Sequence, residues 1–153
     1  MESITKKKSA IGLLMSIGTI VLLTSIHHIY GAIHYQTPWR LHTLHINIPL
    51  FLTIAFLLFY SLKERPGARK MGKLAVMITI VTWIIWVGLY EGVYNHLIKD
   101  ILFFSGLSGQ MMLNLFPPPT YEMPNDVFFE VTGILQIVPL LPIIQFSRLV
   151  WRT

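Results

Sequence analysis

The chain alternates between long apolar runs and short polar segments. Four runs reach the length of about 20 mostly apolar residues that one helical crossing of a bilayer requires. They cover about residues 10–35, 44–62, 73–104 and 127–151. Lipid offers no hydrogen-bond partner to open backbone, and four spans cannot close a barrel, so each run is expected to be a helix. The pattern predicts an all-α fold, an integral membrane four-helix bundle that forms a single transmembrane domain over residues 1–153.

The composition agrees with a membrane protein. Hydrophobic residues make up 54% of the chain and charged residues 12%, whereas soluble domains carry about 25% charged residues. The net charge of +5 comes from basic residues beside the apolar runs, which fits membrane topology better than nucleic-acid binding. The chain has no cysteine, so disulfides, thiolate metal sites and iron–sulfur clusters are excluded. The expected partner is therefore the lipid bilayer, and nucleic acid is not expected.

The basic residues predict the orientation in the membrane. Ten of the twelve Lys and Arg fall at one end of the predicted bundle: Lys6, Lys7, Lys8, Lys63, Arg65, Arg69, Lys70, Lys73, Arg148 and Arg152. Only Arg40 and Lys99 fall at the other end, where they are expected to lie near the water. Positive residues mark the cytoplasmic side. The chain is thus predicted to be a multi-pass protein of the inner (plasma) membrane, with both termini in the cytoplasm.

The histidines and most of the acids gather at the opposite, outer end. This end receives all six histidines (His27, His28, His34, His42, His45 and His96) and five of the seven acids (Glu91, Asp100, Glu122, Asp126 and Glu130). All four predicted helices contribute to this layer. Ionisable groups at membrane depth are costly to bury, and they mark functional sites more often than structural ones.

Helical spacing places several of these groups on shared faces. His27 and His34 are seven residues apart on the first helix and face the same way, while His28 points about 100° away. On the second helix, His42 and His45 share a face if the helix begins by residue 43. These spacings make the two pairs candidate metal ligands.

Glu91 is the acid whose burial is hardest to explain without a partner. It follows a long uncharged run on the third helix, where an unpaired charge would cost about 2.5–3.5 kcal/mol on insertion scales. Counted at 3.6 residues per turn, Glu91 and Asn95 point together, and His96 lies on the neighbouring ridge. On the fourth helix, Asn125 or Asp126 is a predicted N-cap, and Glu130 lies one turn deeper than Asp126. Pro139 is expected to kink this helix.

Imidazoles and carboxylates together suit a zinc, copper or iron ion, so a metal site is the preferred hypothesis. The predicted ligands are His27, His28, His34, His45, Glu91, His96 and Glu130. Residues expected to orient them are Tyr90, Tyr94, Asn95, His42 and Asp126. Redox chemistry, metal handling and hydrolysis are the expected functions, in that order. Neither a paired Glu-x-x-His signature nor His-Glu-x-x-His occurs in the chain, so the pattern names no reaction.

Two other classes of function fit the same residues. Histidines on different helices could hold a b-type haem, as in a membrane cytochrome subunit. Alternatively, the polar layer could bind a membrane protein partner or a second copy of the chain, as in a non-catalytic subunit or assembly factor. In each case the long link of residues 105–126, which is partly apolar, is predicted to fold back over the histidine layer as a lid.

Overall fold

The computed structural model describes residues 2–152, and within that range it contains helices and no strand. The elements are α1 (Glu2–His34), the 3₁₀-helix η1 (Pro38–Leu41), α2 (His42–Ser61), α3 (Ala68–Thr79), the π-helix η2 (Ile80–Ile98), α4 (Lys99–Phe104), α5 (Gly109–Leu115), α6 (Val127–Leu135) and α7 (Leu140–Arg152). Four stretches of these residues are long and apolar enough to cross a membrane: Ile4–His34, Pro38–Ser61, Ala68–Phe104 and Val127–Arg152. The predicted all-α class and the predicted four candidate spans are confirmed.

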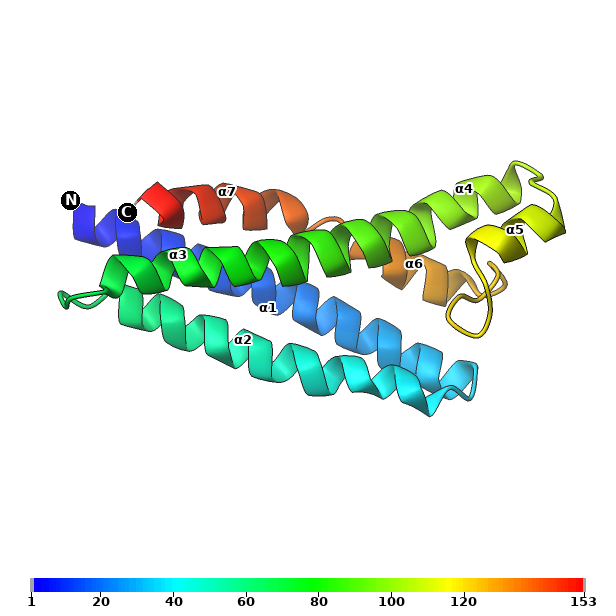
Figure 1. Ribbon diagram of the computed structural model, residues 1–153, viewed down its shortest axis with the longest axis horizontal. Coiled ribbons are helices and arrows are strands. Elements are labelled where there is room, and N and C mark those ends of the chain that lie inside the picture. The colour runs from blue at the N-terminus through cyan, green and yellow to red at the C-terminus, as the bar shows by residue number, and fades with distance from the viewer. Residues whose placement is uncertain (1, 153) are drawn as a thin grey trace.

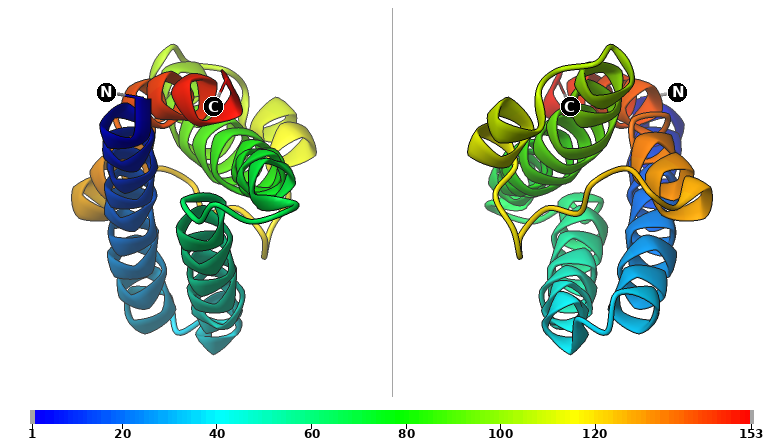
Figure 2. Two further views of the ribbon diagram at one scale, coloured as in Figure 1. Left: turned by 90° about the vertical axis from the view of Figure 1, so that its left-hand side faces the viewer. Right: turned by 90° about the vertical axis from the view of Figure 1, so that its right-hand side faces the viewer.

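The long helices run side by side along one axis (Figure 1), and both chain ends lie at the same end of the bundle. End-on views show α1, α2, α3 and α7 arranged around a common centre (Figure 2), each packed against two neighbours. Toward the opposite end α6 takes the place of α7 and packs against α1 and η2. The acids and histidines described below lie toward that end.

The third span is one rod made of α3, η2 and α4 in direct succession. Its middle section is a π-helix of 19 residues, in which backbone hydrogen bonds reach the fifth residue along the chain rather than the fourth. Most π-helical segments are single turns, and they occur frequently at functional sites. The wider turn changes which side chains of this span face the same way.

The fourth span differs from the single helix that its apolar run predicts. It divides into α6 and α7 at residues 136–139, because Pro139 has no N–H to continue the hydrogen-bond ladder. The expected irregularity at Pro139 is therefore a break between two helices. This break contains Gln136, whose buried side chain accepts a 2.7 Å hydrogen bond from Thr24 Oγ1 of α1.

The core lies in the half of the bundle that contains the chain termini. Leu13, Ile17, Leu58, Trp83 and Ile143 are among its buried members, and they come from all four spans. The outward faces are also apolar, with exposed large hydrophobic side chains along every span. Such continuous exposed apolar surface is unusual for a protein in water, and it fits contact with lipid.

The link after α4 returns toward the helix ends. Helix α5 projects beyond the bundle (Figure 1), and the chain then doubles back toward α6. Phe116 is buried, Tyr94 Oη donates to the backbone oxygen of Leu115 at 3.0 Å, and Tyr90 and Tyr121 share a hydrogen bond of 2.5 Å between their hydroxyls. The returning part of this link therefore lies against the polar end of the bundle.

Candidate metal centre

Three side chains from two spans converge on one point. His27 Nε2 of α1 and His96 Nε2 of η2 are 3.2 Å apart, and Glu91 Oε1 of η2 lies 3.6 Å from each of them. Within residues 2–152, these three residues form the group of His, Asp and Glu ligand atoms close enough to hold one metal ion. Both imidazoles are fully buried, and the Glu91 side chain is 14% exposed.

The spacing of the three atoms matches the dimensions of a metal site. A point equidistant from atoms with these separations lies about 2.0 Å from each of them, and zinc is bound by histidine nitrogen and carboxylate oxygen at about 2.0–2.2 Å. An ion could thus occupy the centre of the triangle with little movement of the side chains.

The proton on His96 is placed by its neighbour Glu130. His96 Nδ1 and Glu130 Oε2 are 2.5 Å apart, and Glu130 Oε1 accepts a 2.9 Å hydrogen bond from Lys99 Nζ. A carboxylate beside an ammonium group is an acceptor, so Nδ1 of His96 carries the hydrogen. In a neutral imidazole this leaves Nε2 with a lone pair that faces the centre. Gly133 makes room for this ring, since a Cβ there would overlap it.

Thr132 places the proton on His27 in the same way. The Thr132 hydroxyl donates to the backbone oxygens of Phe128 and Phe129 at 2.8 and 3.0 Å. Its single hydrogen is therefore used, and Thr132 Oγ1 accepts from His27 Nδ1 at 3.1 Å. The Nε2 of neutral His27 is then also a bare lone pair.

The centre consequently holds three electron-pair donors facing one another: the Nε2 atoms of His27 and His96, and Oε1 of Glu91. Without a cation between them, these atoms would repel each other in a low-dielectric environment. Either a metal ion or an added proton must occupy the centre. Histidine ligands that donate their other N–H to a carboxylate or an oxygen are the usual arrangement around protein-bound metals.

The π-helix explains why Glu91 and His96 face the same point. Residues five apart in an α-helix point about 140° away from each other. In η2 they are about one turn apart, because the hydrogen bonds span five residues. The sequence-based placement of His96 on a separate ridge from Glu91 is therefore wrong, and the π-helical turn is the physical reason.

A chain of ion pairs continues from the centre toward the outer end. Lys99 Nζ donates to Glu130 Oε1 and, at 2.7 Å, to the backbone oxygen of Glu122. Arg40 Nη2 donates to Glu122 Oε1 at 3.0 Å. Lys99 is fully buried and Arg40 is 3% exposed, so the expectation that both lie near the water is wrong. Their long side chains reach inward to meet carboxylates, which compensates the cost of burial.

The other predicted histidine ligands lie at different distances from the centre. His28 is the nearest, with Nε2 3.8 Å from Glu91 Oε1 and Nδ1 3.2 Å from Thr43 Oγ1. His34 is exposed and lies 3.8 Å from Asp126 Oδ2. His45 is exposed on α2, and His42 is exposed with Nδ1 2.5 Å from the Trp39 backbone oxygen. The group of three includes none of these four histidines.

The predicted supporting residues make contacts of their own. Tyr90 and Tyr94 bond to Tyr121 and Leu115 between α4 and α6, as described above, and Asn95 is buried. Asp126 caps α6 by accepting from the Phe129 N–H at 2.7 Å, and it accepts from Tyr30 Oη at 3.0 Å. The Phe129 N–H holds the pKa of Asp126 below its ordinary value. Burial, followed by the hydrogen bond with Tyr90, raises the pKa of Tyr121.

A cavity of about 390 Å³ lies beside the centre, between α1, α2 and η2. Glu91 and His28 form part of its wall, together with Asn47, Asn95 and Trp86. The cavity gives the Glu91 side of the centre access to a small molecule, whereas His27 and His96 are closed in on the other side by Phe129, whose ring centroid lies 4.2 and 5.2 Å from theirs.

Sequence reasoning missed the contributions of Thr132 and Lys99. Lys99 follows His96 by three residues, a spacing that places two helical side chains on one face. The sequence therefore indicated that Lys99 lies near Glu130, the acid that hydrogen-bonds to His96. Thr132 had no such signal, because residues two apart on a helix, such as Glu130 and Thr132, do not face each other. Its role depends on α6 packing against α1, which the sequence does not reveal.

Comparison with known proteins gave no match to a family model, to a curated protein or to a solved structure.

Proposed function

We propose that this protein is a multi-pass membrane protein that binds one transition-metal ion through His27 Nε2, His96 Nε2 and Glu91 Oε1. The observation that carries the proposal is the convergence of three electron-pair donors, with both histidine N–H groups turned outward onto Thr132 and Glu130. Glu130 is a predicted ligand that we now assign to orienting His96, because its oxygens face His96 Nδ1 and Lys99.

The competing account has no metal and places a proton at the centre, either on Glu91, which would then hydrogen-bond to a histidine or tyrosine, or on one Nε2. A proton on one Nε2 would satisfy the 3.2 Å pair of imidazoles. It would leave Glu91 Oε1 3.6 Å from both nitrogens, which is longer than a hydrogen bond of about 2.7–3.2 Å. A metal ion about 2.0 Å from all three atoms satisfies the carboxylate as well, so the geometry favours the metal.

The ligand set suits metal-dependent chemistry. Structural zinc sites are closed by four protein ligands, whereas catalytic zinc sites have three and keep a position open. Two histidines and one carboxylate also form the set used by non-haem iron(II) enzymes. The open side here is the one next to Glu91, toward the cavity. We therefore place redox chemistry first, with metal handling and hydrolysis as the other uses of such a centre.

The haem alternative receives no support from this arrangement. Two axial imidazoles of one haem would have to lie on opposite faces of the macrocycle, with the iron between them. Here the two Nε2 atoms are 3.2 Å apart, and a carboxylate oxygen shares their centre. A porphyrin cannot enter that space without separating α1 from η2.

We propose that the centre lies toward the extracytoplasmic side of the inner (plasma) membrane and that both termini are cytoplasmic. The distribution of ten Lys and Arg toward the end that contains the termini supports this orientation. A reporter enzyme that is active only in the periplasm, fused after Thr153, should be inactive. Full activity of that fusion would reverse the orientation.

Elemental analysis of the purified protein tests the metal directly. Protein produced with zinc, copper, iron and manganese supplied should carry close to one ion per chain, and its absorption spectrum should lack a Soret band. His27→Ala and His96→Ala should each lose most of the ion. His45→Ala is the matched control, because that histidine is exposed and lies outside the group. Wild-type protein without stoichiometric metal would leave the proton account standing.

A further inference from the structure

A groove of about 310 Å³ lies between α7 and the third span, at the end of the bundle that contains the chain termini. Val76, Ile80 and Ile84, spaced four residues apart, form one wall, and Ile144 of α7 belongs to the other. The α7 helix packs against both α3 and η2. Ile80 is 38% exposed, so the groove opens on the outward surface of two candidate membrane spans.

The groove is nearly as long as one leaflet of a membrane is thick. Its walls extend over residues 76–84 and 144–152, and each of these stretches advances about 12 Å along its helix at about 1.5 Å per residue. One leaflet spans about half of the ~30 Å hydrocarbon core, which is roughly 15 Å. The apolar walls therefore suit an acyl chain that lies parallel to the helices.

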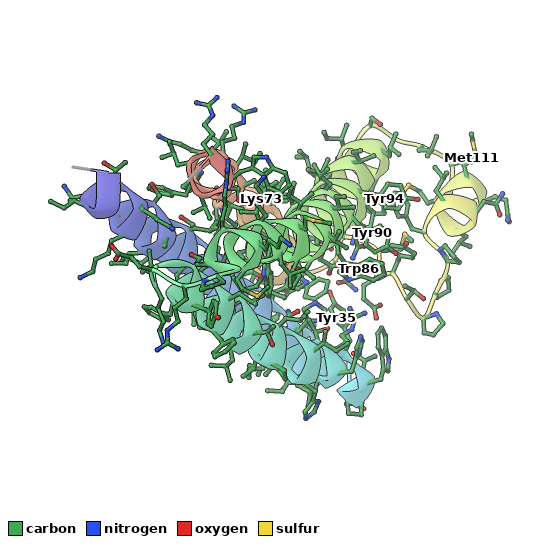
Figure 3. All side chains as sticks on the ribbon, turned by 60° about the vertical axis from the view of Figure 1, so that its left-hand side comes forward. Tyr35, Lys73, Trp86, Tyr90, Tyr94 and Met111 are labelled. Atoms are coloured by element: carbon green, nitrogen blue, oxygen red, sulfur yellow. The ribbon has the colours of Figure 1, made fainter. Side chains whose placement is uncertain are left out.

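Three basic side chains lie at the end of the groove nearest the chain termini. Arg148 and Arg152 of α7 line the groove and are exposed, and their spacing of four residues places them on one face of the helix. Lys73 extends from α3 beside α7 (Figure 3), and its Nζ lies 5.0 Å from the centroid of the Trp151 ring, which also lines the groove. Among the side chains that the structure describes, no carboxylate forms an ion pair with these three cations.

These cations define the headgroup that the groove accepts. A guanidinium group matches phosphate oxygens with paired N–H donors, so the two arginines suit a phosphate. The ammonium group of a zwitterionic headgroup would meet three cations and no carboxylate of the described side chains, and like charges repel. A tryptophan such as Trp151 is typical of the headgroup level of a membrane. The best-fitting ligand is therefore a phospholipid with a net negative charge.

From these observations we propose that the groove binds one anionic phospholipid. Its phosphate accepts hydrogen bonds from Arg148 and Arg152, Lys73 adds a third positive charge, and one acyl chain lies along Ile80 and Ile144. Basic pockets between membrane helices on the cytoplasmic side bind anionic headgroups in this way. This site goes beyond the proposed metal centre and does not depend on it, since no residue of the groove belongs to the ligand group.

Two lipids with the same acyl chains test the headgroup. Dioleoyl phosphatidylglycerol and dioleoyl phosphatidylcholine are titrated onto delipidated protein in detergent, and native mass spectrometry counts the bound lipid. Phosphatidylglycerol should saturate at one molecule per chain. Phosphatidylcholine should bind at least about fivefold more weakly, since each basic residue near an anionic lipid contributes about that factor. Equal binding of the two lipids, or displacement of phosphatidylglycerol by equimolar inorganic phosphate, would overturn the proposal.

Paired variants separate this groove from the general positive charge of the same end. Arg148→Gln and Arg152→Gln should each weaken phosphatidylglycerol binding about fivefold, and about 25-fold together. The double variant Arg65→Gln with Arg69→Gln is the matched control, because both arginines are exposed at this end of the bundle and neither lines the groove. An equal loss of affinity in the control would show that the charge of the surface, and not the groove, binds the lipid.

A larger side chain in the apolar wall tests the place of the acyl chain. Ile84→Trp fills the groove without changing its charge and should abolish saturable binding of phosphatidylglycerol. Ile85→Trp is the control, since Ile85 is the next residue, is 51% exposed and does not line the groove. Wild-type affinity in Ile84→Trp would refute the proposed position of the chain.

The metal content of the same proteins separates this proposal from the preceding one. Arg148→Gln, Arg152→Gln and Ile84→Trp should keep the wild-type amount of metal, which also shows that they are folded, and His96→Ala should keep saturable lipid binding. Wild-type protein that holds metal but binds no phosphatidylglycerol would contradict the lipid site alone. Wild-type protein that binds the lipid but holds no metal would contradict only the metal centre.

Discussion

Replacing Thr132 with valine tests whether the protons of the centre are placed by their neighbours. Valine has nearly the shape of threonine but removes the oxygen that accepts from His27 Nδ1 at 3.1 Å. The His27 side chain is fully buried, so water does not replace that acceptor. The hydrogen then moves to Nε2, where it blocks the metal, or it stays on Nδ1 as a buried unpaired donor.

Both outcomes weaken metal binding by a similar amount. A buried unpaired N–H costs about 1–3 kcal/mol, which is roughly a 5- to 150-fold change in affinity at 1.4 kcal/mol per tenfold. Removing an orienting partner of a metal-bound histidine typically costs 10–100-fold. We therefore expect Thr132→Val to raise the dissociation constant for zinc about 10- to 100-fold, and Thr132→Ser, which keeps the hydroxyl, to stay close to wild type.

Isothermal titration calorimetry of metal-stripped protein in detergent measures this change. Thr79→Val is the matched control, because Thr79 is a buried helical threonine that donates to the Ala75 backbone oxygen at 2.8 Å, as Thr132 does to Phe128. It lies on α3, outside the ligand group. A Thr132→Val protein that binds zinc within twofold of wild type would refute the argument from the His27 proton.

Three further substitutions test other parts of the structure. Gly133→Ala places a methyl group on the His96 ring and should abolish most metal binding while costing about 1–3 kcal/mol of stability; full metal occupancy would contradict this packing. Lys99→Met leaves the Glu130 carboxylate with one partner fewer and should lower the free energy of unfolding by about 3–5 kcal/mol, measured by denaturant titration; an unchanged value would mean that the pair adds nothing. Asp126→Ala removes the cap of α6 and should cost about 1 kcal/mol at neutral pH. Because the folded-state pKa of Asp126 is depressed from 3.8, its contribution is complete above that pH and is lost as the pH falls through the lower value; a deficit that persists unchanged at still lower pH would show another cause.

The sequence by itself determined the number, the type and the approximate limits of the spans. Runs of apolar residues at membrane length leave a helix as the stable solution, because every backbone group must be paired within the segment. The gathering of the six histidines toward one end also followed from the sequence, since alternating spans fix which helix ends are neighbours. These inferences depend on length and order along the chain.

The choice of partners within that layer was decided by the tertiary structure. His27, His28 and His34 are close in sequence, yet the centre takes His27, because α6 packs on that face of α1 and brings Thr132 to its Nδ1. Lys99 and Arg40 are buried partners of Glu130, which lies on α6, and of Glu122, which lies on the returning link. Neither packing contact has a local pattern that marks it.

Glu91 and His96 face the same point because of a helix geometry that the spacing of apolar residues does not reveal. With 3.6 residues per turn they belong to separate ridges, and the π-helical turn of η2 brings them onto one point. Such a turn is stabilised by contacts across the bundle rather than by the propensities of its own residues. The sequence therefore supplied the donors and their depth, and the packing of η2 against α1 and α6 arranged them around one centre.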